Sequence, residues 1–345
     1  MGHIVADEKL MRAALIEARR GAGRTSPNPA VGAILVINRK IVSKGHHSRA
    51  GAPHAEIECL RQFRRPIPKD ATLYVTLEPC ATTGRTGPCT NAIIDAGVRH
   101  VVIGTTDPNP KNARRGIAAL ERAGISVRSG IIERECLELN EGYNKWITSK
   151  RPFVIAKCGM TLDGRLTAAP GESRWITSAA SRRHSHQLRA QVDAILIGAN
   201  TLRTDNPHLT IRGIRAATQP WRIVLSRSGR LPKSAHLFVD RFAHKTIVCR
   251  GTNLENVMRR LGEKEITSVL IEGGGDVLGQ ALDQGLIDKV QLYLGASLTG
   301  GSTIAFAGRG AGSTIQALRL CRIRYEQIGN DVCVSGYPAK GAGND

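Results

Sequence analysis

Short apolar runs alternate with helix-like stretches along this chain, and the alternation starts a second time after residue 150. In the first part, strand-like runs bounded by glycine, proline or asparagine lie at residues 31–36, 73–76 and 101–104. Helix-like stretches lie around them, at residues 7–20, 55–63, 90–96, 114–123 and 133–140. Strands that alternate with helices are typical of layered α/β domains. We expect Asp7 to cap the first helix and Gly97 to end the third.

The second part has the same kind of pattern. Strands are predicted at residues 154–157, 194–198, 222–226, 246–249 and 268–271, and helices at residues 178–191 and 254–261. A chain of 345 residues has the length of two domains. Lys150, Arg151 and Pro152 interrupt the helical pattern just before the second series begins. The sequence therefore predicts two α/β domains, residues 1–148 and 149–345.

The chain is strongly basic, with 49 Lys and Arg against 29 Asp and Glu. A nucleic-acid-binding arm concentrates such charge, whereas here residues 1–150 carry net +9 and residues 151–345 carry net +11. We interpret the charge as suited to anionic small ligands and expect no nucleic-acid partner. We expect no membrane span, because no run of about 18 apolar residues occurs. Asp7 and Glu8 interrupt the N-terminus where a secretory signal is apolar, so a cytoplasmic protein is expected.

One histidine and two cysteines have the context of metal ligands. His54 lies in Pro-His-Ala-Glu at the start of a predicted helix, Cys80 follows a predicted strand in Glu-Pro-Cys, and Cys89 opens the next helix in Gly-Pro-Cys-Thr. One imidazole and two thiolates suit Zn²⁺ and leave a fourth position for water, which is typical of a catalytic zinc. Glu56, two residues after His54, could reach that water without being a ligand, so we expect it to be the catalytic proton shuttle.

The order His-x-Glu followed by Pro-Cys and a second cysteine is the signature of zinc-dependent nucleobase deaminases. The two cysteines are separated by nine positions here instead of three. The wider spacing occurs together with four other motifs. These are Ser-Pro-Asn-Pro-Ala-Val-Gly at 26–32, Ala-Gly-Ala-Pro-His-Ala-Glu at 50–56, Tyr-Val-Thr-Leu-Glu-Pro-Cys at 74–80 and Thr-Asp-Pro-Asn-Pro at 106–110.

With these motifs the chain resembles the bifunctional riboflavin-biosynthesis family, in which a diaminohydroxyphosphoribosylaminopyrimidine deaminase is fused to a 5-amino-6-(5-phosphoribosylamino)uracil reductase. The resemblance covers about residues 5–337. It implies a cytidine-deaminase-like α/β/α domain in which His54, Cys80 and Cys89 hold zinc and Glu56 is the proton donor. The resemblance also implies a substrate pocket shaped by Asn28, His47, Arg85, Asp107 and Asn109.

The second half has three polar segments of its own. Lys157 ends a predicted strand, Trp175 lies among serine, arginine and threonine at a predicted helix start, and residues 271–279 form a glycine-rich turn into a helix. Glycines at a helix start let a backbone approach a phosphate, although a simple tight turn explains them equally well. Several arginines surround residues 197–210, where guanidinium groups suit a phosphate monoester and a solvated basic face is the alternative.

This half resembles the dihydrofolate-reductase-like α/β reductase domain of the same fusion, which implies NADPH as hydride donor. The resemblance assigns cofactor contacts to Gly159, Trp175, Thr201, Asp205, Gly274, Gly275, Asp276, Val277, Leu278, Gly279 and Gln280. It assigns substrate contacts to Lys157, Ser173, Arg189, Leu209, Arg212 and Glu272. It also implies pairing of copies through the reductase half. The family usually has Asp-Ser or Asp-Thr at the turn where this chain has Arg227 and Ser228. The resemblance therefore assigns no cofactor contact to Ser228.

The expected function is therefore deamination of a phosphorylated aminopyrimidine, followed by NADPH-dependent reduction of its ribosyl group to a ribityl chain. An RNA or tRNA nucleobase deaminase is the alternative enzyme, but only 13 aromatic residues in 345 are present for stacking on bases. A non-catalytic RNA-binding protein with a structural zinc is a third hypothesis. Glu56 argues against it, because a structural site needs no acid beside the metal.

Overall fold

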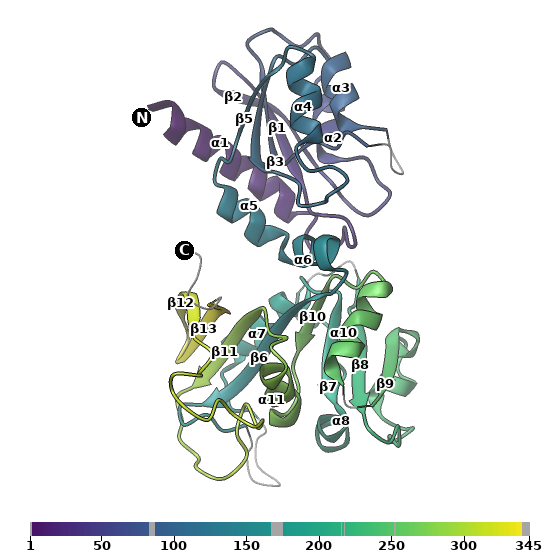
Figure 1. Cartoon of the computed structure of the whole chain (residues 1–345), viewed down its shortest axis with the longest axis vertical. Coiled ribbons are helices and arrows are strands. Elements are labelled where there is room, and N and C mark those ends of the chain that lie inside the picture. The colour runs from purple at the N-terminus through teal and green to yellow at the C-terminus, as the bar shows by residue number, and fades with distance from the viewer. Residues whose placement is uncertain are drawn as a thin grey trace. The chain divides into compact units, whose positions relative to one another are not determined.

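The computed structural model describes residues 2–82, 87–166, 175–214, 216, 218–251 and 253–339. The chain divides into two compact units, Met1–Lys150 and Arg151–Asp345, which are called unit 1 and unit 2 below. Figure 1 labels the elements of both units. Among the described residues, no helix combines the length and the apolar character needed to cross a bilayer.

Unit 1 is a five-stranded sheet with helices on both faces (Figure 1). Its strands are β1 (Gly32–Ile37), β2 (Lys40–His46), β3 (Thr72–Leu77), β4 (His100–Thr105) and β5 (Ser126–Ser129). Its helices are α1 (Gly2–Arg19), α2 (Ala55–Gln62), α3 (Cys89–Asp95), α4 (Arg115–Arg122), α5 (Glu133–Leu139) and α6 (Glu141–Ser149). The strand order is β2-β1-β3-β4-β5. Strand β1 is antiparallel to both neighbours, and β3, β4 and β5 are parallel.

Alternating side chains of β1 supply both cores of unit 1. Ala33 and Leu35 belong to the core that includes α2, α3 and α4, whereas Ile34 and Val36 pack with α1 and α5. This alternation follows from the two-residue period of a strand, which points successive side chains to opposite faces. The strand is continuously apolar because both of its faces are covered, and each fully buried side chain contributes about 1.5–3 kcal/mol.

The prediction that Asp7 caps the first helix is wrong. Helix α1 begins at Gly2, and Asp7 lies inside it with only 4% of its surface exposed. Its carboxylate accepts a hydrogen bond of 2.6 Å from the Tyr74 hydroxyl and pairs with Arg128. The Asp7 side chain therefore connects α1 to the sheet through hydrogen bonds. The prediction for Gly97 is confirmed, since it follows α3 with φ of 75° and donates its N–H to the Ile94 carbonyl.

Unit 2 is built on an eight-stranded sheet of order β12-β13-β11-β6-β10-β7-β8-β9. Its strands are β6 (Phe153–Thr161), β7 (Ala194–Gly198), β8 (Trp221–Ser226), β9 (Thr246–Arg250), β10 (Ser268–Ile271), β11 (Lys289–Gly295), β12 (Leu320–Ile328) and β13 (Asp331–Pro338). Its helices are α7 (Ala179–Arg189), α8 (Ala199–Asp205), α9 (His236–Val239), the 3₁₀ turn η1 (Ala243–Lys245), α10 (Leu254–Glu263) and α11 (Gly275–Asp283).

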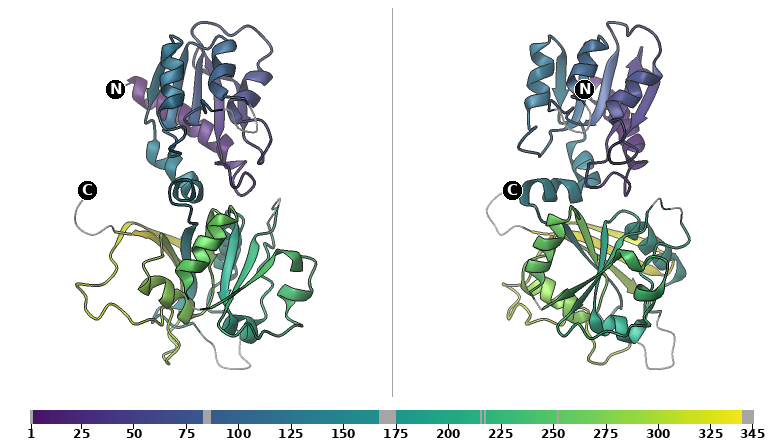
Figure 2. Two further views of the ribbon diagram at one scale, coloured as in Figure 1. Left: turned by 45° about the vertical axis from the view of Figure 1, so that its right-hand side comes forward. Right: turned by 90° about the vertical axis from the view of Figure 1, so that its right-hand side faces the viewer.

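The six strands from β11 to β9 run parallel, and β13 and β12 form an antiparallel hairpin at one end. Helices lie on both faces of this sheet (Figure 2). The core on one face includes residues of α10 and α11, and the core on the other includes residues of α8 and α9. Because the strands are parallel, the segments that follow β6, β10, β7 and β8 emerge at one edge of the sheet, where ligands bind in open α/β sheets.

Candidate functional sites

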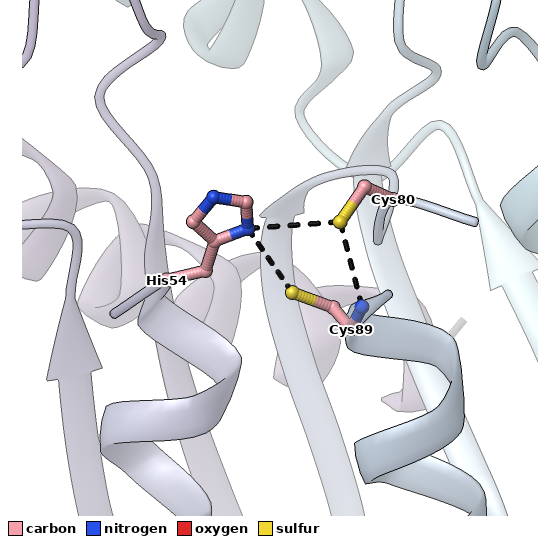
Figure 3. A group of neighbouring side chains, drawn as sticks. All are labelled: His54, Cys80 and Cys89. Carbon is pink, nitrogen blue, oxygen red and sulfur yellow. Dashed lines mark hydrogen bonds between the residues drawn. The ribbon is translucent and has the colours of Figure 1, made fainter. Parts of the chain in front are cut away.

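Three predicted metal ligands of unit 1 meet at one edge of its sheet. His54 immediately precedes α2, Cys80 lies three residues beyond the end of β3, and Cys89 is the first residue of α3. Figure 3 shows the imidazole directed toward both sulfur atoms. His54 Nδ1 lies 3.2 Å from Cys89 Sγ and 3.6 Å from Cys80 Sγ, and the potential ligand atoms all lie within 4.8 Å of one another.

These separations fit a zinc ion. Zn–N and Zn–S distances of about 2.0 and 2.3 Å around a tetrahedral ion place nitrogen and sulfur about 3.6 Å apart. The Cys89 N–H also donates a 3.4 Å hydrogen bond to Cys80 Sγ. Hydrogen bonds from the Cys89 thiol and from His54 lower the pKa of Cys80 to about 4. A Cys80 thiolate that accepts the N–H of the first residue of α3 and lies beside an imidazole belongs to the soft donor set that Zn²⁺ prefers. The residues present therefore fit the metal.

Glu56 lies in the first turn of α2 and is only 3% exposed. Its Oε2 atom is buried without a hydrogen-bond partner among the described residues. Burial, with a further contribution from the charge of Cys80, raises the pKa of Glu56 from 4.5 to about 7. A carboxyl group with a pKa near neutrality can both accept and donate a proton at physiological pH. An unpartnered buried oxygen beside the cluster suits a proton shuttle.

The structure also brings Asn28 and His47 to the cluster. Asn28 Nδ2 lies 3.2 Å from His47 Nε2, and His47 Nδ1 lies 3.0 Å from the Pro53 carbonyl. The rings of His47 and His54 meet edge to face with centroids 5.2 Å apart. His47 is 2% exposed, and burial lowers its pKa. A neutral His47 therefore lies against the ligand His54.

Sequence reasoning missed the role of Glu78, which precedes Pro79 and Cys80. Its buried carboxylate accepts hydrogen bonds from the backbone N–H groups of Asp107, Arg114, Gly116 and Ile117 at 2.9–3.3 Å. Glu78 thereby holds the cysteine loop against the segment after β4. Nothing in the local sequence indicates this, since the four donors lie 29 to 39 residues away.

The predicted pocket residues Asp107 and Asn109 lie on that same segment. Asp107 is 7% exposed, and its carboxylate accepts hydrogen bonds from the Asn109 N–H, the Asn112 side-chain amide and the Tyr143 hydroxyl. Burial raises its pKa. Asn109 is half-buried beside it. Strands β3 and β4 are parallel neighbours, so Cys80 and Asp107, which follow them, share one edge of the sheet. Arg85 lies outside the described residues.

Unit 2 has a cavity of about 200 Å³ that brings together several predicted site residues. Lys157, Trp175, Arg189 and Arg212 line it. Arg182, one of the arginines that the sequence indicated as suited to a phosphate, also lines it. Five further residues were not predicted as contacts, namely Thr177, Ser181, Ser185, His186 and Tyr293. His186 Nδ1 accepts the Arg212 backbone N–H at 3.2 Å, and burial together with Arg189 and Arg212 lowers the pKa of His186 to about 4. The cavity therefore contains a neutral imidazole among fixed cations.

Glu272 is the anion of this cluster. Its carboxylate accepts two hydrogen bonds from Arg189, at 2.6 and 2.8 Å, and Lys157 Nζ lies 3.7 Å away. Burial alone would raise the pKa of Glu272, but Arg189 and Lys157 outweigh it and lower the pKa to about 2. Arg189 also donates to the Thr210 carbonyl at 3.0 Å. Its guanidinium is thus engaged within the protein, whereas Arg212 is exposed.

The glycine-rich turn before α11 contains both exposed residues and closely packed glycines. Gly274 and Asp276 are exposed, and a Cβ on Gly274 would lie 3.2 Å from Thr201 Oγ1, so Thr201 and Gly274 are adjacent. By contrast, a Cβ on Gly275 would lie 2.2 Å from the Ile304 carbonyl oxygen, and one on Gly279 would lie 2.4 Å from the Gly308 nitrogen. These two glycines are therefore needed for packing within unit 2.

The other residues predicted for the reductase site differ in how exposed they are. Val277 and Leu278 belong to the core, and Leu209, at φ of 50°, is also buried, with 3% of its surface exposed. Gly159 lies beside Thr177 of the cavity, Asp205 is exposed at the end of α8, and Gln280 is partly buried with its Oε1 unpartnered among the described residues. Ser173 lies outside the described residues.

An open basic pocket of about 660 Å³ follows the carboxyl end of β8. Arg203, Arg230 and Lys233 line it with Gly229, Leu231 and Pro232. Arg203 lies on α8, two residues after Thr201, and donates to the Arg230 carbonyl at 2.9 Å. The groups that could hold a dinucleotide thus extend from Gly274 across α8 to the loop after β8.

Comparison with known proteins identifies both halves of the chain. Residues 5–105 match the family described as cytidine and deoxycytidylate deaminase zinc-binding region, and residues 152–334 match the RibD C-terminal domain. The chain is 38% identical to the riboflavin biosynthesis protein RibD of Aquifex aeolicus, over 95% of this chain and 97% of the relative. It is 40% identical to the RibD protein of Synechocystis, over 97% of both chains.

Solved structures agree with these matches. RibD of Acinetobacter baumannii superposes with a TM-score of 0.89 at 34% identity, covering 98% of this chain and all of the other. The Thermotoga maritima protein titled diaminohydroxyphosphoribosylaminopyrimidine deaminase/5-amino-6-(5-phosphoribosylamino)uracil reductase superposes with a TM-score of 0.88 at 34% identity and the same coverage. The expected cytidine-deaminase-like and reductase folds are confirmed.

Proposed function

This chain belongs to the RibD family of bifunctional riboflavin-biosynthesis deaminase–reductases, and we propose from this that it acts on the phosphorylated pyrimidine named for its Thermotoga maritima relative. We propose that residues 1–148 form the zinc-dependent deaminase domain. Residues 149–345 form the NADPH-dependent reductase domain. The observation that carries the first assignment is the His54, Cys80 and Cys89 cluster beside the buried, unpartnered Glu56 oxygen.

In the deaminase step, His54, Cys80 and Cys89 would hold Zn²⁺, which when bound would lower the pKa of water and so provide a nucleophile to replace the exocyclic amine. Glu56 would accept one proton of that water and pass it to the ring nitrogen as the C–O bond forms. It would then take the proton of the newly added hydroxyl and donate it to the amine, so that the C–N bond breaks, ammonia leaves and the C=O bond forms. Its pKa of about 7 suits both transfers. Asn28, His47, Asp107, Asn109 and Arg85 are proposed to hold the substrate at the same edge of the sheet.

In the reductase step, a bound NADPH would supply a hydride to C1′. The ring C1′–O bond would break, and the released oxygen would take a proton from solvent to become a hydroxyl. The 200 Å³ cavity is proposed to hold the substrate. Arg189 is bound by Glu272 through two hydrogen bonds, so we assign it to fixing that carboxylate and Lys157 in place. Arg212 is exposed, and its guanidinium is proposed to bind the phosphate. Ser173 and the Leu209 backbone are proposed to contact the remaining substrate.

The cofactor is proposed to lie along the edge from Gly159 and Trp175 to Gly274, Thr201 and Asp205. Gly274 and Asp276 are exposed at the start of α11, where backbone N–H groups suit a pyrophosphate. The remaining predicted contacts are Gly275, Val277, Leu278, Gly279 and Gln280, and most of these are buried. We propose that the basic pocket of Arg203, Arg230 and Lys233 binds the additional phosphate that distinguishes NADPH from NADH.

We further propose that copies pair through unit 2. Strand β12 is the edge of the sheet, and its exposed face carries Ile323 at 41% and Tyr325 at 73% exposure. An exposed apolar edge strand is a template for pairing with another chain. A cytoplasmic location is proposed because all eight cysteines are free thiols. The two anionic ligands, and no nucleic acid, are the proposed partners of the basic surface.

A coupled assay tests this function. Zinc-replete protein receives the diaminopyrimidinone ribosyl phosphate, and ammonia release is followed before and after addition of NADPH. We expect one ammonia per substrate without NADPH, and loss of NADPH absorbance only after deamination. Absence of ammonia release would refute the deaminase assignment, whereas ammonia release without NADPH oxidation would refute the reductase assignment. Transfer RNA at physiological salt should neither bind tightly nor release ammonia.

A further inference from the structure

A buried amide connects the cysteine loop of unit 1 to the Asp107 carboxylate. Asn112 is 2% exposed. Its Nδ2 donates a 2.9 Å hydrogen bond to Asp107 Oδ2, and its Oδ1 accepts a 2.9 Å hydrogen bond from the N–H of Ala81, the residue after Cys80. A single side chain thus contacts both the loop that holds a metal ligand and a carboxylate proposed to hold the substrate.

The other contacts of Asp107 show why this donor matters. Oδ1 accepts hydrogen bonds from the Asn109 N–H at 2.9 Å and from the Tyr143 hydroxyl at 3.0 Å, whereas Oδ2 accepts the one from Asn112. A carboxylate oxygen has two lone pairs, so Oδ1 is fully engaged and Oδ2 keeps one position for a further donor. Asn112 therefore sets the direction of the oxygen that is available to a ligand.

The backbone around this amide is held independently. Glu78 accepts the N–H groups of Asp107, Arg114, Gly116 and Ile117, and a Cβ on Gly116 would lie 2.0 Å from the Pro79 carbonyl oxygen. The two segments are thus already packed closely by contacts that do not involve Asn112. Loss of the Asn112 amide would leave these backbone contacts in place and remove the hydrogen bond that orients Asp107 Oδ2, while Oδ1 would keep its two donors.

We propose that Asn112 is a positioning residue of the deaminase, whose side-chain amide fixes the Asp107 carboxylate relative to the Cys80 loop and so determines how well the substrate binds. The inference rests on the proposed function, because it requires Asp107 to contact the substrate. An amide is suited to this role, since it offers one donor to the carboxylate and one acceptor to the Ala81 N–H. Neither a carboxylate nor an apolar side chain offers both.

Three variants separate positioning from folding. Asn112→Asp keeps the acceptor for Ala81 and loses the donor to Asp107, whereas Asn112→Leu loses both. The double exchange Asp107→Asn with Asn112→Asp reverses the donor and acceptor between the two side chains. It can therefore keep all of the hydrogen bonds while moving the buried charge. Asn144→Leu is the matched control, because its amide donates to the Leu137 carbonyl at the surface.

For Asn112→Asp we expect a rise of about tenfold or more in the deaminase KM, a change in kcat of less than about threefold, and wild-type zinc content. For Asn112→Leu we expect the same rise in KM and faster loss of zinc to a chelator. The double exchange should recover the wild-type thermal midpoint and zinc content but keep the high KM. Reductase turnover of the deaminated substrate should be unchanged in all of these variants.

A wild-type KM in both single variants would overturn the proposal. Recovery of the wild-type KM by the double exchange would overturn it as well, because the amide would then serve the fold alone. Failure of the proposed function gives a different result, since the wild-type protein itself would then release no ammonia.

Discussion

Replacing Glu272 by glutamine removes the only carboxylate seen to pair with Arg189 and Lys157 in the described cluster. The Glu272 side chain is 5% exposed, and those of Arg189 and Lys157 are 14% and 18% exposed, so solvent screens the cluster little. The neighbours hold the pKa of Glu272 at about 2 instead of 4.5. At 1.36 kcal/mol per pKa unit, ionisation of this group stabilises unit 2 by about 3 kcal/mol.

The direction of the Glu272 pKa shift determines how the stability difference between wild type and variant changes with pH. Because the pKa of Glu272 is lower in the folded state than in the unfolded state, its stabilisation is complete well above pH 4.5 and is lost as the pH falls toward 2. Glu272→Gln cannot ionise at this position. The difference in unfolding free energy between wild type and variant should therefore fall from about 3 kcal/mol at pH 7 to about 1 kcal/mol at pH 3.

Urea unfolding followed by tryptophan fluorescence measures this difference. A Trp146→Phe background leaves Trp175 and Trp221, both in unit 2, as the reporters. Glu263→Gln is the matched control, because Glu263 pairs with Arg259 at 3.2 Å on the exposed face of α10 and should contribute less than about 1 kcal/mol. A loss at pH 7 no larger than that of Glu263→Gln, or one that does not change by pH 3, would refute the reasoning.

Three further predictions concern ligands and assembly. Arg212→Ala should raise the reductase KM for substrate about tenfold or more and spare ammonia release; equal losses in both assays would contradict separate sites. Arg230→Glu should raise the KM for NADPH about tenfold or more and leave the KM for NADH nearly unchanged, measured by initial rates with each cofactor; parallel losses with both would exclude the basic pocket as the phosphate site. Tyr325→Lys should shift sedimentation equilibrium from dimer to monomer; a wild-type monomer would contradict pairing through β12.

The buried parallel strands were predictable because both of their faces are covered. Strands β7 and β10 have the predicted bounds; β7 is continuously apolar, and β10 is apolar after Ser268. Strands β2 and β12 were missed because most of their residues are exposed, so neither has an apolar run. The first helix was placed too late, since Asp7 has the side chain of a cap but is held by Tyr74 and Arg128, residues far along the chain.

The zinc cluster could be predicted because residue type, order and flanking prolines specify it locally. The roles of Glu78 and Asn112 could not, because each depends on N–H groups or side chains that only the folded backbone brings together. The glycine-rich turn was visible in the sequence, but the reason for its glycines was not. Ligand approach and close packing both require glycine, and the tight contacts of Gly275 and Gly279 with residues 304–308 became visible only in the structure.

Substitution of the proposed proton shuttle tests the central claim most directly. Glu56→Gln removes the titrating group and keeps its size, while His54, Cys80 and Cys89 are unaltered. We expect one zinc per chain, loss of ammonia release by about a hundredfold or more, and normal NADPH oxidation with substrate that is already deaminated. Loss of zinc would contradict the non-ligand role of Glu56, and ammonia release at the wild-type rate would contradict its role in catalysis.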